Sequence, residues 1–132
     1  MTILSGCGVK IDGTWRVSGY KIVYEAGTVY EYSAQDVEGF TENQGQNLTQ
    51  EQITQNIVIL AHSIRKDTMI TFKDGKILNL QIMGSQSDIE YKLEDNILKI
   101  GDLDTEFIYE NNQIYNIESQ DDYEIVTYFE KV

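Results

Sequence analysis

Hydrophobic and polar side chains alternate along much of the second half of the chain. Apolar residues at positions 78, 80 and 82 alternate with Asn79 and Gln81, and Ile89, Tyr91 and Leu93 alternate with charged residues. Because successive side chains of a strand point to opposite faces of a sheet, a period of two predicts strands with one buried face. On this pattern we expect seven strands, at 69–73, 76–83, 88–94, 97–100, 106–110, 114–118 and 123–131.

Pairs of turn-forming residues separate several of these strands. Asp74-Gly75 is a strong signal for a two-residue hairpin, and Asp95-Asn96 and Asn111-Asn112 lie between later strands. Hairpin therefore follows hairpin without a long crossover. This order favours an up-and-down barrel over a Greek-key sandwich.

One or two further strands precede position 34. In the segment from Gly13 to Tyr24, Trp15 and Val17 share one face, whereas Tyr20, Ile22 and Tyr24 share the other. This change of parity near position 19 predicts a β-bulge or a bend. A second strand is expected at 28–33, after a turn.

A helix is predicted between these strands and the later ones, at about 49–66. Thr49 is a good N-cap, and Gln52, three residues later, completes a capping box. Helical spacing predicts that one apolar face is buried, made of Ile53, Ile57, Leu60, Ala61 and Ile64. Residues 34–48 are polar and aperiodic, and we expect them to form a long loop.

These elements predict one mostly β domain. The expected fold is an antiparallel up-and-down barrel of about eight strands, with one α-helix (about 49–66) inserted after the first strands. We assign residues 13–132 to this barrel and residues 1–12 to a signal-peptide remnant and tether.

The N-terminal segment predicts where in the cell the protein is located. Leu4-Ser5-Gly6-Cys7 resembles a bacterial lipobox, in which the cysteine becomes the lipidated first residue of the mature protein. The resemblance implies a lipid anchor at Cys7 and an extracytoplasmic location on a bacterial membrane. The alternative is an ordinary tail that carries a free thiol.

The barrel pattern also resembles a known family. Gly13-Thr14-Trp15, followed by the meander and the aromatic-rich last strand at 123–132, is similar to the bacterial lipocalin-like (calycin-type) lipoproteins. In that family the tryptophan closes one end of the barrel, usually stacked on an arginine from late in the chain. The arginines of this chain are Arg16 and Arg65.

The formal net charge of −12 limits the classes of partner. A polyanion repels phosphate backbones and anionic lipid surfaces, so we expect no nucleic-acid partner and membrane contact only through Cys7. The charge keeps small domains soluble and apart, which favours a monomer, and it also suits a basic protein partner.

Residues for nucleophilic or zinc chemistry are sparse. Cys7 and His62 are the one cysteine and the one histidine of the chain, so an internal disulfide and a Cys/His zinc cluster are both excluded. We expect His62 to be a partly exposed or hydrogen-bonded structural residue.

Two acidic clusters remain as candidate calcium ligands. They are Asp102, Asp104 and Glu106, and Asp121, Asp122 and Glu124. Both lie where turns are expected and neither has the spacing of a calcium-binding loop, so solvated turn charge is the simpler interpretation. We predict no catalytic residue, no metal site and no cofactor, and hence a protein that is not an enzyme.

Two functions suit such a barrel. In the first, a cell-surface lipoprotein holds a small apolar or amphipathic ligand in the barrel, lined by Trp15, Tyr20, Tyr24 and Tyr91. In the alternative, side chains fill the barrel, and its acidic surface or the 34–48 loop binds a basic protein, as in an inhibitor or immunity-type lipoprotein.

Overall fold

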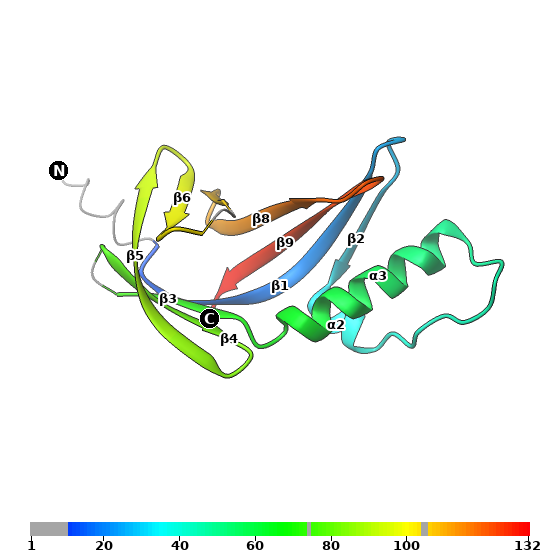
Figure 1. Ribbon diagram of the computed structural model, residues 1–132, viewed down its shortest axis with the longest axis horizontal. Helices are drawn as coiled ribbons and strands as arrows, with labels where there is room; N and C mark the ends of the chain where they lie inside the picture. The colour runs from blue at the N-terminus through cyan, green and yellow to red at the C-terminus, as the bar shows by residue number, and fades with distance from the viewer. Residues whose placement is uncertain (1–10, 74, 104–105) are drawn as a thin grey trace.

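The computed structural model describes residues 11–73, 75–103 and 106–132 (Figure 1). The lipobox-like segment at 4–7 and residue Asp74 of the predicted hairpin turn lie outside this range, as does Asp104 of the first acidic cluster.

The described residues form one antiparallel sheet of nine strands, eight of which close into a barrel. The barrel follows chain order from β1 through β3 to β9, and β9 pairs back with β1. The strands are β1 (Gly13–Tyr24), β2 (Val29–Ser33), β3 (Met69–Phe72), β4 (Ile77–Ile82), β5 (Ser85–Glu94), β6 (Ile97–Ile100), β7 (Phe107–Glu110), β8 (Gln113–Ser119) and β9 (Tyr123–Lys131). The predicted fold, with two strands before the helix and seven after it, is confirmed.

Strand β1 pairs with two strands along one of its edges. Its residues 13–16 pair with β3 and its residues 19–23 pair with β2, while β9 pairs along the opposite edge. The register with β9 shifts between Val17 and Gly19, which confirms the predicted bulge. Gly19 suits this place because a Cβ there would lie 2.9 Å from the carbonyl oxygen of Tyr32.

Two helices follow β2. Helix α3 (Gln50–Arg65) has the predicted capping box, with Gln52 N–H donating to the Thr49 hydroxyl and Thr49 N–H donating to the Gln52 side chain. The expectation of an unbroken loop at 34–48 is wrong at its start, where α2 (Ala34–Glu38) forms. The Ser33 hydroxyl caps α2 by accepting from Asp36 N–H, and Val37 is buried. The short helix was missed because one turn carries no periodicity.

The buried face of α3 differs from the predicted one. Thr54, Val58, Ala61 and His62 are buried. Of the predicted face only Ala61 is among them; Ile57 is partly buried, and Ile53, Leu60 and Ile64 are exposed. The helix is therefore rotated by about one residue, or about 100°, from the expected orientation.

The barrel core is formed by inward side chains of the strands. The largest fully buried ones are Trp15, Tyr20, Ile22, Ile70, Leu78, Leu98, Ile100 and Ile114. The Trp15 indole donates to the carbonyl of Ile11 (2.9 Å) and packs edge-on against Tyr109. Lys131 Nζ of the last strand lies 5.5 Å from the Trp15 ring centroid. Ile11, which we had placed in the tether, is itself buried in this core.

Two isoleucines of β8 test which side chains of this strand point into the core. Ile114 is fully buried, whereas Ile117 is 42% exposed. We expect Ile114→Ala to lower the free energy of unfolding by about 2–5 kcal/mol, because it leaves a cavity in the core. Ile117→Ala should cost less than about 1 kcal/mol. Urea denaturation measures both, and equal losses would contradict the assignment.

Candidate functional site

Two tyrosines of β1 hold helix α3 on the sheet. The Tyr24 hydroxyl lies 2.6 Å from Thr54 Oγ1, which itself donates to the carbonyl of Gln50 (2.7 Å) and therefore accepts from Tyr24. The Tyr20 hydroxyl lies 2.7 Å from Nδ1 of His62. These bonds are the reason why α3 buries Thr54 and His62 in place of aliphatic residues, since buried polar groups require partners.

His62 links three elements, which confirms that it is hydrogen-bonded. Its Nε2 lies 3.0 Å from a carboxylate oxygen of Glu38 at the end of α2. Burial raises the pKa of Tyr20 well above its ordinary value, so this hydroxyl keeps its proton. The tautomer that carries its proton on Nε2 satisfies both contacts, because Nε2–H donates to Glu38 and Nδ1 accepts from Tyr20.

An ion pair ties the last turn of α3 to the barrel. Arg65 Nη2 lies 2.6 Å from a carboxylate oxygen of Glu118 on β8, and both side chains are partly buried. Together with the two tyrosine contacts, this pair fixes α3 at both ends. Its rotation about its own axis is thereby set.

The fixed rotation leaves an apolar stripe on the outer face of α3. Leu60 is 65% exposed, Ile64 49% and Ile53 44%, with Ile57 partly buried between them. Ile53, Ile57 and Leu60 of this stripe line a groove of about 510 Å³, which we call the α3 groove, whereas Ile64 lies outside its lining. Its lining consists of Glu42, Leu48, Ile53, Asn56, Ile57, Ile59, Leu60 and Ser63.

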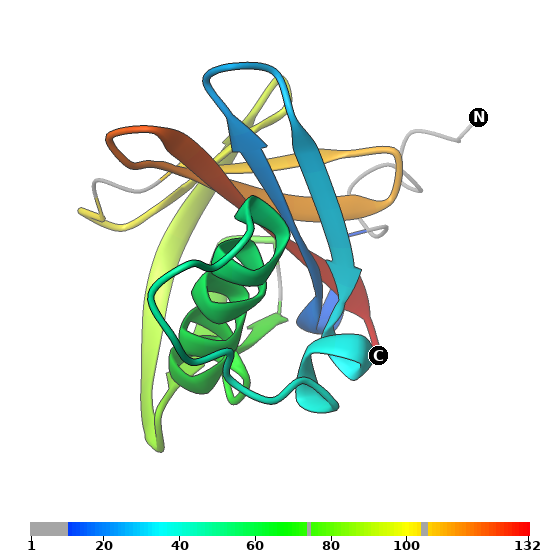
Figure 2. The same cartoon turned by 90° about the vertical axis from the view of Figure 1, so that its right-hand side faces the viewer.

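The segment between α2 and α3 forms the other side of the α3 groove, and Figure 2 shows it running along the helix. Asn43 and Asn56 hold it there: Asn43 N–H donates to Asn56 Oδ1 (2.8 Å), and Asn56 Nδ2 donates to the Asn43 carbonyl (3.0 Å). Asn43 Nδ2 also donates to the Gln52 carbonyl (3.2 Å) and to Gln55 Oε1 (3.0 Å). The groove is therefore built in advance of any partner.

The elements around the α3 groove are uniformly acidic. Between Lys21 and Arg65 the chain has six carboxylate side chains and no lysine or arginine. Glu42 is the carboxylate that lines the groove itself. Such a distribution attracts cationic groups over a distance limited by salt screening.

The four residues predicted to line a ligand cavity lie apart from one another. Trp15 belongs to the core, and Tyr20, Tyr24 and Tyr91 border three different surface depressions of about 520, 460 and 770 Å³. Each ring packs on a neighbouring side chain, for example Tyr91 on Phe72 at 4.9 Å between centroids. The sequence did not show what these rings touch.

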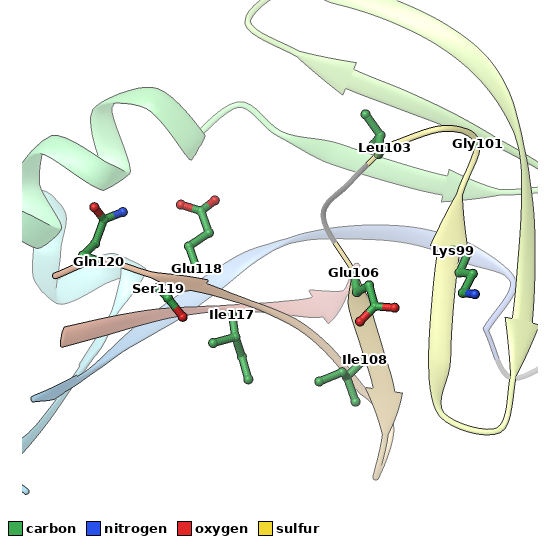
Figure 3. Close-up of a pocket in the computed structure, with 9 residues that line it drawn as sticks. All are labelled: Lys99, Gly101, Leu103, Glu106, Ile108, Ile117, Glu118, Ser119 and Gln120. Atoms are coloured by element: carbon green, nitrogen blue, oxygen red, sulfur yellow. The ribbon is translucent and has the colours of Figure 1, made fainter. Parts of the chain in front are cut away.

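A further depression, of about 870 Å³, is a notch beside β6, β7 and β8 (Figure 3). Glu118 and Gln120 project from one side of this part of the wall, whereas Ile108 and Ile117 project from the other. The notch therefore opens to both faces of the sheet. Its charged lining residues, Lys99, Glu106 and Glu118, are of both signs and do not select one class of ligand.

Comparison with known proteins adds no family to these observations. No family model, no curated protein and no solved structure matches the chain. The lipocalin-like resemblance and the lipid anchor at Cys7 therefore stay predictions.

Residues 11–73, 75–103 and 106–132 contain no cluster of three or more His, Cys, Asp or Glu side chains that could hold a metal ion. No helix in the described part of the chain has the length and apolar character needed to cross a membrane.

The Tyr20–His62 contact can be tested against a tyrosine on the outside of the barrel. Tyr20→Phe should lower the free energy of unfolding by about 1–3 kcal/mol, because it leaves His62 Nδ1 buried without its donor. Tyr115, which donates to Glu110 (2.7 Å), is the control, and Tyr115→Phe should cost less than about 1 kcal/mol. Equal losses in chemical denaturation would contradict a special role for Tyr20.

Hydrogen exchange tests whether the hydrogen bonds of Asn43 hold the segment between α2 and α3 against α3. In Asn43→Ala we expect amides of residues 41–48 to exchange about tenfold faster or more, because several hydrogen bonds to α3 are lost. Asn47→Ala changes an exposed asparagine of the same segment and should leave exchange unchanged. Unchanged exchange in Asn43→Ala would show that the segment is held by other contacts.

Proposed function

We propose that this protein is a binding module that docks another protein in the α3 groove. The observation that carries the proposal is the exposed stripe of Ile53, Leu60 and Ile64 on a helix whose opposite face is fixed to the sheet. Fully burying a leucine or isoleucine stabilises a protein by about 1.5–3 kcal/mol. The exposed stripe contributes none of this stabilisation in the free protein. A partner that covers the stripe would gain it as binding free energy.

The packing of the barrel supports this choice over a small-ligand function. The inward side chains listed above occupy the barrel interior, and their rings and aliphatic groups contact one another. The barrel then serves as a rigid scaffold, and recognition falls to the surface. Binding of a small apolar molecule inside the barrel stays a prediction.

Charge defines the partner's chemistry. The partner should present apolar side chains for the stripe, surrounded by lysine or arginine that faces the acidic elements around the groove. Such an interface forms faster at low salt and weakens as salt rises. The lipid anchor predicted at Cys7 would display the groove outside the cytoplasm.

Site-specific photocross-linking tests the proposal in the cells that make the protein. We expect a photoreactive residue at position 60 to give a discrete cross-linked product, and one at position 117, an exposed aliphatic site on the barrel, to give none. Once identified and purified, the captured protein should bind at least about tenfold more weakly to Leu60→Lys, which removes an apolar contact and repels a basic surface. Ile117→Lys should bind normally.

Two controls keep the result interpretable. Leu60→Lys should unfold within about 0.5 kcal/mol of the original protein, because the side chain is exposed on the helix surface. Equal cross-linking at positions 60 and 117, or unchanged affinity of Leu60→Lys, would refute docking in the α3 groove.

A further inference from the structure

The backbone groups that border the α3 groove indicate whether an extended or a helical segment fits there. The groove is floored by α3, whose backbone groups between the capped ends bond within the helix. The backbone N–H and C=O of Asn43 bond to the side-chain amide of Asn56 at the groove wall. An extended peptide lying here would bury its own N–H and C=O groups without partners, at about 1–3 kcal/mol for each group. A helix satisfies these groups internally and avoids that cost.

The spacing of the stripe also favours a helix. Ile53, Ile57, Leu60 and Ile64 are separated by four, three and four residues. This is the a/d spacing at which one helix packs against a second in coiled coils, with crossing angles of about +20°. The stripe extends over about 16 Å, the length of three turns.

The charges around the groove define the polar residues of its occupant. Glu42 lines the groove, and the exposed carboxylate of Glu38 lies 3.0 Å from Nε2 of His62 in the last turn of α3. Carboxylates therefore lie both at the groove wall and near the end of the helix. A partner should carry lysine or arginine beside its apolar residues.

From these three observations we infer that the occupant of the α3 groove is an amphipathic α-helix. It has apolar residues at four-three spacing and basic residues beside them. The inference rests on the proposed docking function and specifies its partner. A second copy of this chain is a poor occupant, because it would bring another groove carboxylate and a net charge of −12 to the same interface.

The test is a selection that does not presuppose the answer. Random peptides of about 16 residues are displayed and selected on the full chain, with counter-selection on Leu60→Lys. We expect the surviving peptides to share apolar residues at four-three spacing, with lysine or arginine beside them. Apolar residues at a period of two, or proline within the motif, would overturn the helical occupant.

Synthetic versions of the selected peptides then test their conformation. The peptide should gain helical circular dichroism on binding, and a proline at its centre should weaken binding at least tenfold. Binding without a gain in helicity, or unchanged binding of the proline peptide, would overturn the helical occupant.

The outcomes separate this inference from the proposed function. If position 60 captures a partner that binds through a strand or a loop, the docking function stands and the helical occupant is wrong. If no peptide distinguishes the original protein from Leu60→Lys and position 60 captures nothing, both are wrong.

Discussion

The hydrogen bonds from Tyr20 and Tyr24 to helix α3 are the contacts on which the rest of the molecule depends. They place polar side chains of α3 at the buried interface. Turning the helix by about 100° would bury the aliphatic stripe, but it would leave both tyrosine hydroxyls and His62 facing groups that cannot bond to them. The same turn would remove Val58 from the core. An apolar outer face is thus a consequence of a polar inner one.

Local signals in the sequence predicted most of the fold. A period of two, the turn pairs at 95–96 and 111–112 and the Thr49–Gln52 capping box each act over a few residues, and each was confirmed. The short helix α2 lacked such a signal beyond its serine cap. The lining role assigned to Trp15 and three tyrosines depended on what faces each ring across the barrel, which no local pattern encodes.

The orientation of α3 shows why the candidate site escaped prediction. Hydrophobicity alone identified the stripe as the buried face, because Thr54 and His62 count as polar in any such scale. Only the sheet, which presents hydroxyls at the matching positions, makes those two residues the buried ones. The residues of the groove were visible in the sequence, whereas their exposure was decided by contacts between segments far apart in the chain.

The bulge in β1 has a consequence for how this chain tolerates changes in length. At the bulge, the step from Val17 to Gly19 on β1 corresponds to a single step, from Phe129 to Tyr128, on β9. Loss of the codon for Ser18 would therefore restore a regular strand and leave Tyr20 and Tyr24 facing α3. Loss of one codon between those tyrosines would turn Tyr24 toward solvent. Insertions and deletions in β1 should accordingly be confined, among related chains, to the bulge.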